Sequence, residues 1–396
     1  MRKRSRVYEG LIASLVSPLV LFVTSPLIAR ILGPEGRGQM AYVLTVLVLL
    51  DYIALGGAIN YLLVEAKTDA EFSQKILGIS QHLRKTTLIA SIFSVVLATK
   101  YLSAGVGTFC FLLILLSSFR NAKKIELKKV SAIIKSDWKT LNRERIFIPI
   151  VRLLLTFTAY FLHITDPLIF VAVQVLAGVA VSQFLFRKYS VPKDRDPRKS
   201  SNLDSQINSY FVWSIFENVG YWGVNLLIGV LIPAYEFGIL AIALVAGEVI
   251  LTLEKFTIKY QTTLHIEELS NSSTTVQERK PYSYKSSLLP VAIYAVVVYF
   301  SIPIVFGYAY SSSVIPSLFC ICAGYLRLLL RSQNYTVAQQ RKKHPSVIAE
   351  FSIVVSGVLF CFLLLLYPNA FVGSVIIFAS VLVGFSFSIV ARRRFL

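Results

Sequence analysis

Five polar side chains recur along one otherwise apolar stretch, and their spacing places them on one face of a helix. They are Tyr210, Ser214, Glu217, Tyr221 and Asn225, at steps of four, three, four and four residues. Such steps follow the helical repeat. In a membrane a carboxylate is costly and usually faces the interior of a helix bundle. The stripe therefore favours a polar path between helices, with hydrogen bonding between packed helices as the alternative.

Two arginines border other apolar stretches and have the chemistry to bind phosphate. Arg30 closes the stretch 11–30, and Arg152 lies about one turn inside the stretch 146–164, with Thr156 and His163 near the same helical face. The planar guanidinium binds phosphate oxygens in bidentate fashion. Each arginine can instead extend its head group to the membrane interface. The sequence leaves both interpretations open.

Two further carboxylates, Asp51 and Glu248, lie well inside apolar stretches. Each would either pair with a basic residue in the fold or bind a coupling ion, and Glu217 is a third coupling-ion candidate. The four cysteines and four histidines show no metal-ligand spacing and no pairing of a nucleophile with a base. The sequence therefore predicts no catalytic residues, no metal site and no cofactor.

The elements that position these side chains are predicted to be transmembrane helices. The chain has 396 residues, 55% of them hydrophobic, and a mean hydropathy of +0.66. Stretches near 20 residues with few charges span a membrane as helices. We expect an all-α integral membrane protein with about twelve spans. The predicted spans are 11–30, 40–63, 80–99, 103–120, 146–164, 167–187, 208–231, 235–254, 286–306, 309–330, 346–367 and 369–390. The division between the third and the fourth span is the weakest of these predictions.

The distribution of basic residues predicts the orientation. A net charge of +19 is also typical of nucleic-acid-binding proteins, but cytoplasmic loops of membrane proteins carry an excess of Lys and Arg. With the N-terminus inside and twelve spans, the inner side holds 36 of the 40 Lys and Arg, the outer side holds Arg30, Arg37 and Lys100, and Arg152 lies within a span. Both termini are therefore predicted to be cytoplasmic. The basic segment 120–145 is expected to form an amphipathic helix on the anionic inner leaflet, or to help gather an anionic lipid.

The chain resembles itself at an offset of 200 residues. Leu32, Gly38, Ala41 and Leu44 correspond to Ile232, Gly238, Ala241 and Leu244, and Ser14, Ser17 and Ser25 correspond to Ser214, Glu217 and Asn225. Ser17 and Ser25 are therefore expected to line the same path as the polar stripe. This predicts a six-helix lobe over 1–187, a cytoplasmic linker over 188–207 and a second six-helix lobe over 208–396. An even number of spans per half gives parallel repeats related by a pseudo-two-fold axis along the membrane normal.

A family resemblance is carried by the turns of the two halves. The segment "ARILGPEGRGQMAYVLTVLVLLDYIALG" resembles the entry pattern of the polysaccharide-transport flippases, a family of the multidrug/oligosaccharidyl-lipid/polysaccharide exporter superfamily. "IPAYEFGILAIAL" is similar to the corresponding turn of their second half. "IPIVFGYAYSSSVIPSLFCICAGY" and "NYTVAQQRKKHPSVIAEFSIVVSGVLF" resemble a later stretch. Residues 100–200 and 259–285 carry little of the pattern.

The resemblance implies a transporter rather than an enzyme. The expected substrate is a polyprenyl-pyrophosphate-linked oligosaccharide repeat unit, moved from the inner to the outer leaflet for O-antigen, capsule or exopolysaccharide biosynthesis. The expected location is the bacterial inner membrane, with membrane lipids, a polysaccharide polymerase and a chain-length regulator as partners and no nucleic acid. A drug or cation antiporter of the same superfamily and a membrane polysaccharide polymerase or ligase are the competing functions. A polymerase or ligase would need a sizeable outer loop, and every predicted outer segment is short.

Overall fold

The structure is a computed structural model that describes most, but not all, of the chain. The described residues are 2–55, 57–65, 71–73, 75–76, 79, 83, 85–90, 92, 124–189, 211–212, 216, 219–251, 284–339 and 344–395. All regular structure in these ranges is helical. The all-α prediction is confirmed for this part of the chain.

Most of the predicted spans coincide with helices. They are α1 (Arg2–Leu55), α2 (Ala58–Glu65), α5 (Trp138–Phe161), α6 (Pro167–Leu185), the π-helix η2 (Val219–Gly223), α8 (Val224–Leu231), α10 (Tyr284–Phe306), the 3-10 helix η3 (Tyr308–Ser313), α11 (Val314–Gln339), α12 (His344–Cys361), α13 (Leu363–Leu366) and α14 (Ala370–Phe395). Helical residues also cover 124–134 and 234–251. Seven helices of the described part are long and apolar enough to cross a membrane. The predicted fourth span, most of the third and most of the linker lie outside the described residues.

The first two predicted spans meet at a sharp bend inside α1. Gly33 has φ 64° and ψ 178°, a left-handed conformation that glycine adopts without steric cost. Beyond the bend Arg37 donates through Nη2 to Oγ of Ser25 over 3.1 Å. In a straight helix, residues twelve apart are separated by roughly 18 Å along the axis. The chain therefore folds back at Gly33, as expected for two successive spans, and Pro34 opens the second segment, where its missing N–H costs nothing.

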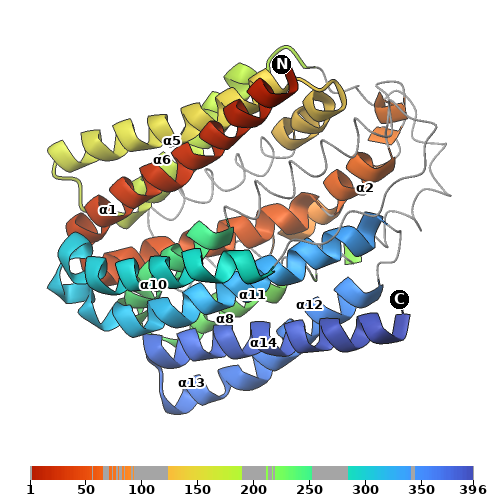
Figure 1. Ribbon diagram of the computed structural model, residues 1–396. Helices are drawn as coiled ribbons and strands as arrows, with labels where there is room; N and C mark the ends of the chain where they lie inside the picture. The colour runs from red at the N-terminus through yellow and green to blue at the C-terminus, as the bar shows by residue number, and fades with distance from the viewer. Residues whose placement is uncertain are drawn as a thin grey trace.

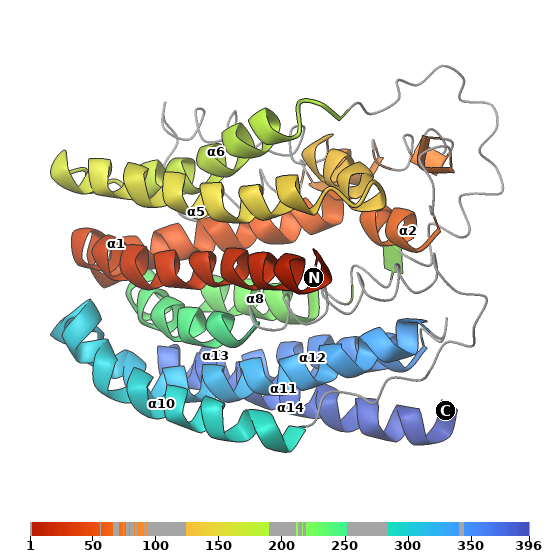
Figure 2. The ribbon, with the colours of Figure 1, turned by 45° about the horizontal axis from the view of Figure 1, so that its top comes forward.

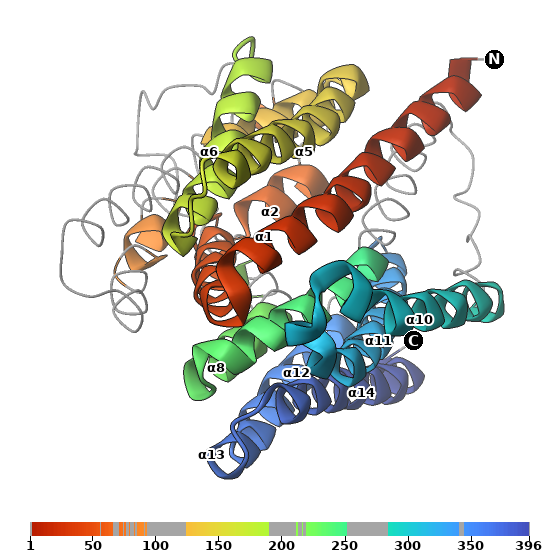
Figure 3. The same cartoon turned by 90° about the vertical axis from the view of Figure 1, so that its left-hand side faces the viewer.

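Two groups of helices follow the order of the chain (Figures 2 and 3). One group contains α1, α2, α5 and α6, and the other contains α8 and α10 to α14. Within the first group α1 packs on α5 and α6, and within the second α14 packs on α11 and α12. We call them the N-terminal and C-terminal groups. The exact boundaries predicted for the two lobes stay a prediction.

The connections alternate between two ends of the bundle. The α5–α6, α10–α11 and α13–α14 connections lie together at the left of Figure 1, whereas both chain termini lie toward the right. We call the left-hand end, to which the bend of α1 also belongs, the hairpin end. Two termini at one end require an even number of crossings. Which end faces the cytoplasm stays a prediction from the Lys and Arg distribution.

The basic segment 120–145 differs from its expected form in the part that is described. Residues 124–134 are helical, the chain turns at 135–137, and α5 starts at Trp138. Leu127 and Val130 are 4% and 1% exposed and pack against residues of α2 such as Tyr61. The apolar face therefore packs inside the protein rather than on a membrane surface. An amphipathic pattern predicts that a face is covered but not which apolar surface covers it.

Candidate functional site

The two groups of helices touch at the hairpin end through a reciprocal pair of glycine contacts. A Cβ added to Gly38 would lie 1.8 Å from the carbonyl oxygen of Ala234. A Cβ added to Gly238 would lie 1.8 Å from the carbonyl oxygen of Pro34. Both contacts relate residues by the same offset, since 34 and 38 become 234 and 238 when 200 is added. The backbones approach this closely because neither glycine has a side chain, as at the small-residue crossings of membrane helices.

Side chains extend this contact between the groups. The hydroxyl of Tyr310, a residue of η3, donates to the carbonyl oxygen of Ala29 over 3.1 Å, and both residues are buried. Tyr42 and Phe237 form an edge-to-face pair with ring centroids 6.4 Å apart. Arg30 is exposed and donates through Nη2 to the carbonyl oxygen of Ile304 in α10, over 3.0 Å. The predicted phosphate ligand Arg30 therefore bridges the two groups at the hairpin end.

Arg37 is the most buried arginine of this contact. Its side chain is 7% exposed, and besides Ser25 it approaches Sδ of Met40 at 3.6 Å. Its Nε has no hydrogen-bond partner in the described part of the chain. The hydroxyl of Tyr310 is close enough for an electrostatic interaction with the guanidinium. A buried cation held by neutral groups alone is costly, because such groups do not replace its hydration.

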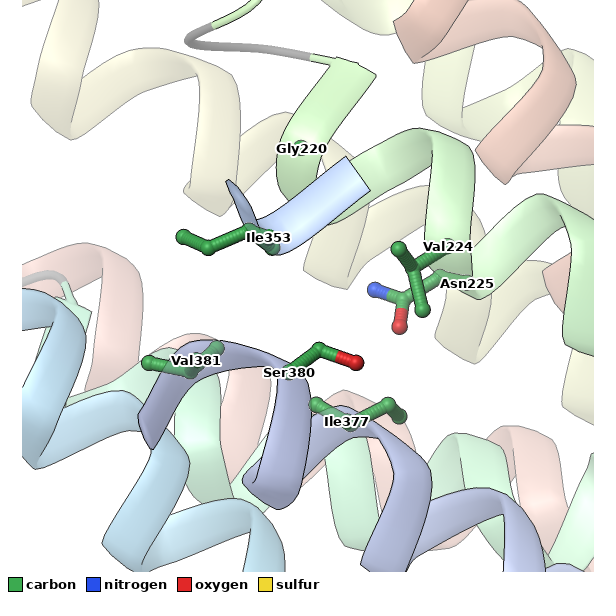
Figure 4. A pocket seen from close by; sticks show the side chains of 7 residues that line it. All are labelled: Gly220, Val224, Asn225, Ile353, Ile377, Ser380 and Val381. Carbon is green, nitrogen blue, oxygen red and sulfur yellow. The ribbon is translucent and has the colours of Figure 1, made fainter. Parts of the chain in front are cut away.

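The predicted stripe residue Asn225 lines a separate narrow hollow inside the C-terminal group, which has no room for a water molecule. Asn225 is 1% exposed, and neither its amide nitrogen nor its amide oxygen has a hydrogen-bond partner in the described part. The amide points from α8 toward Ile377 and Ser380 of α14 (Figure 4). The hollow is lined by Gly220, Val224, Asn225, Ile353, Ile377, Ser380 and Val381. The preceding π-helix η2 disturbs the regular backbone here, as π-helical turns often do at functional sites.

A carboxylate that sequence reasoning did not select lies beside this hollow. A Cβ added to Gly220 would lie 2.7 Å from Oε2 of Glu350, a residue of α12 that is 1% exposed. Arg327 of α11 is equally buried. Both residues stand near the ends of predicted spans, where a charge is expected to reach water. The sequence therefore does not predict that Glu350 and Arg327 are buried.

The other predicted residues of the N-terminal group are dispersed. Ser25 is buried under Arg37, whereas Ser17 is exposed on α1. Nε of Arg152 donates to the carbonyl oxygen of Gln174 over 3.0 Å, which ties α5 to α6. Thr156 is fully buried, whereas His163 is exposed in the turn after α5. Arg152, Thr156 and His163 therefore do not form one surface.

Asp51 lies near a charged network at the opposite end of the N-terminal group. Nζ of Lys129 lies 2.5 Å from a carboxylate oxygen of Glu126 and 2.8 Å from one of Glu144. Ser182 of α6 donates to the same oxygen of Glu144 over 2.6 Å. Burial alone would lower the pKa of Lys129, but the two carboxylates outweigh it and raise that pKa. Asp51 is partly buried, and its Oδ1 has no hydrogen-bond partner in the described part.

Three predicted site residues receive little or no structural description. Glu217 lies outside the described residues, and the side chain of Tyr221 is not described. Glu248 is partly buried in the helix Ala234–Leu251. No group of three or more His, Cys, Asp or Glu suited to a metal ion occurs in the described ranges. Of the cysteines in these ranges, Cys320 and Cys361 are buried and Cys322 is exposed.

Comparisons with known proteins give one distant likeness. No family model matches the chain, and no curated protein sequence matches it. Among solved structures, the chain is similar to a MOP superfamily transporter from Pyrococcus furiosus Vc1 (DSM3638), whose binding pocket is described as having reverse polarity. The alignment covers 98% of this chain and 93% of that chain, with a TM-score of 0.45 and 14% sequence identity. This likeness is too distant to decide the fold or the function.

Proposed function

We propose that this protein is a membrane flippase that moves a lipid-linked, pyrophosphate-containing oligosaccharide from the inner to the outer leaflet. The observation that carries the proposal is the reciprocal contact of Gly38 with Ala234 and of Gly238 with Pro34. Two repeat-related halves that meet through equivalent residues support a transporter with its path between the halves. With the predicted orientation, the contact closes the outer end of that path.

The positive charges near the contact favour an anionic substrate. Arg30 and Arg37 both lie at the hairpin end, and Arg37 has no ion pair in the described part of the chain. A path for cationic drugs would favour acidic and aromatic groups with few basic ones. The resemblance of the turn 29–56 to polysaccharide-transport flippases supports the saccharide as cargo. We propose that membrane lipids surround the polyprenyl tail while the sugar and phosphates cross between the groups, and that a polymerase and a chain-length regulator act next on the exported unit.

Buried carboxylates are the proposed sites of a coupling ion. Asp51 presents a buried oxygen without a hydrogen-bond partner in the described ranges. Glu248 and Glu217 remain candidates from their places in apolar stretches. Transport against a gradient would require the ion to bind one arrangement of the groups more tightly than the other.

The test is replacement of a known oligosaccharide flippase by this protein. In a bacterial strain lacking its native flippase, we expect the protein to reduce the lipid-linked repeat units that accumulate on the inner leaflet. Rescue of a panel of such strains, each with a different repeat unit, would identify the saccharide that the protein accepts. If no strain is rescued and the protein instead confers resistance to cationic dyes, the antiporter function replaces the proposal.

A further inference from the structure

We propose that Arg37 is a gate-linked binding site for a phosphate-type anion, hidden while the two helix groups touch and presented when they part at the hairpin end. The inference rests on the proposed function, because it names the residue that would hold the phosphates of the substrate at the outer end of the path. Sequence patterns pointed instead to Arg30 and Arg152. The structure separates the three arginines by their partners and by their burial.

The first argument is the incomplete satisfaction of the guanidinium. Arg37 is 7% exposed, and its contacts in the described part of the chain are the Ser25 hydroxyl at 3.1 Å and the Met40 sulfur at 3.6 Å. A guanidinium has five N–H donors and matches phosphate bidentately. A hydroxyl and a weakly accepting thioether leave most of that capacity unused, and Nε has no partner in the described ranges. A cation buried in this way is suited to an anion that is not part of the protein.

The second argument is the position of Arg37 between the two groups. The next residue, Gly38, packs against the carbonyl oxygen of Ala234. Tyr310 of the C-terminal group donates to Ala29 over 3.1 Å and lies within electrostatic range of the guanidinium. Separation of the groups at the hairpin end would remove the C-terminal group from one side of Arg37. The guanidinium would then meet solvent and any anion in the path.

The third argument distinguishes Arg37 from the other two candidates. Arg152 is held within the N-terminal group by the carbonyl oxygen of Gln174, so separation of the groups does not uncover it. Arg30 donates to Ile304 across the contact but is already exposed in the present arrangement, so an anion can reach it while the groups still touch. Among these three, Arg37 is the buried one, and it lies next to Gly38 of the contact. An anion bound to Arg37 would therefore favour the open arrangement, because it binds only there.

The experiment measures binding of inorganic pyrophosphate to the purified full-length protein in neutral detergent, by calorimetry and by the shift in melting temperature. We expect the wild type to bind, Arg37→Gln to lose at least about tenfold in affinity and Arg37→Lys to lose less, because hydrogen bonds to a charged group are strong and Lys keeps the charge without the fork. Arg152→Gln is the matched control and should bind as the wild type does. In the absence of pyrophosphate, each variant must first melt within a few degrees of the wild type. If Arg37→Gln does not fold, Ser25→Ala replaces it as a milder variant, because it removes only the hydroxyl that accepts from Arg37.

A second variant tests the link to the gate. Tyr310→Phe removes the hydrogen bond to Ala29 and should raise the affinity for pyrophosphate several-fold, since opening becomes easier. Affinity in Arg37→Gln equal to that of the wild type would overturn the anion site, and unchanged or weaker binding in Tyr310→Phe would overturn its link to the gate. Nanodiscs containing polyprenyl pyrophosphate or phosphatidylglycerol then identify the source of the phosphate. These binding results do not depend on transport, so the anion site and the flippase function can fail separately.

Discussion

Gly38 and Gly238 lie face to face across the junction of the two helix groups, where a Cβ on Gly38 would come within 2.8 Å of the backbone nitrogen of Gly238. The two residues are 200 positions apart, which is the offset of the internal repeat. A contact between equivalent residues of two repeats lies on or near the axis that relates them. The same contact can therefore be released symmetrically from both sides when the groups separate.

The first prediction concerns the side-chain volume at this contact. Gly38→Ala or Gly238→Ala inserts a methyl group where a carbonyl oxygen lies, and overpacking of this kind costs about 1–3 kcal/mol. We expect the closed arrangement at the hairpin end to lose that stabilisation. Transport should fall at normal protein level, and a cysteine introduced at Ala29, which is buried in the contact, should react several-fold faster with an impermeant maleimide. The measurement uses a protein whose native cysteines are replaced.

The matched control for the glycine variants is Gly178→Ala. A Cβ at Gly178 would meet only the tip of the Arg152 side chain, at 3.3 Å, and a flexible side chain can shift at small cost. We expect transport and labelling at position 29 to match those of the parent protein. Equal labelling in Gly38→Ala and in the parent would show that the glycine contact does not hold the groups together.

The second prediction concerns Arg30, whose guanidinium reaches the carbonyl oxygen of Ile304. Arg30→Ala removes a charge-assisted hydrogen bond between the groups and a cation from the outer end of the path. We expect about a tenfold loss of export, with partial recovery in Arg30→Lys, because Lys keeps the charge but not the fork. Lipid-linked repeat units retained on the inner leaflet give the measure. Full export by Arg30→Ala would leave Arg30 as an interfacial residue only.

The third prediction concerns the charged network around Lys129. Lys129→Met removes the ammonium group that contacts both Glu126 and Glu144, and breaking a buried ion pair on one side is strongly destabilising. Because the Lys129 side chain is 23% exposed, we expect a loss of about 2 kcal/mol, less than for a fully buried pair. Thermal unfolding in detergent measures it. The double variant Lys129→Met with Glu144→Gln should recover part of the loss, and no recovery would show that packing, not charge, is responsible.

The fourth prediction is a pH dependence at the start of α5. Asp137 caps this helix and accepts hydrogen bonds from Lys188 at 2.5 Å and Tyr189 at 2.6 Å. Burial alone would raise the pKa of Asp137, but the hydrogen bonds from Lys188, Tyr189 and Thr140 outweigh it and lower that pKa. The folded pKa is thus below the unfolded value of about 3.9, so the stabilisation is complete above pH 4 and disappears as the pH falls through the folded pKa.

Asp137→Asn keeps a capping oxygen but removes the charge. At pH 7 we expect the variant to be less stable than the wild type by about 1 kcal/mol, the usual scale for a hydrogen bond of this kind. The difference in melting temperature should shrink as the pH is lowered below 4. A difference that stays constant down to pH 2 would show that the charge of Asp137 contributes nothing.

The sequence predicts where the helices of this fold lie better than it predicts which surfaces pack against them. Apolar length alone located α6, α10 and α14 within a few residues, because a span must satisfy its own backbone in lipid. The first two predicted spans meet at a bend of α1, where Gly33 has a positive φ. The sequence predicts that the apolar face of residues 124–134 lies on the membrane surface, but this face packs against α2. Periodicity does not distinguish these two kinds of cover.

The candidate site was only partly predictable. The sequence predicts Asn225 on a polar face, and its buried amide has no hydrogen-bond partner among the described residues. The hollow around it also takes residues from α12 and α14, which lie more than 100 residues away in sequence. Arg37 was assigned to an outer turn because arginine usually reaches water there. Its burial accompanies the bend of α1, which brings Ser25 within hydrogen-bond distance of a residue twelve positions away.

The most direct test of the proposed function is transport by the purified protein in liposomes. A fluorescent polyprenyl-pyrophosphate-linked oligosaccharide is incorporated into both leaflets, and an impermeant glycosidase added outside reports the fraction that reaches the outer leaflet. We predict that vesicles containing the protein expose the inner-leaflet substrate to the enzyme, whereas protein-free vesicles and vesicles with Gly38→Ala keep it protected. Protection equal to that of protein-free vesicles, together with uptake of a cationic dye driven by a proton or sodium gradient, would contradict the flippase and favour an antiporter.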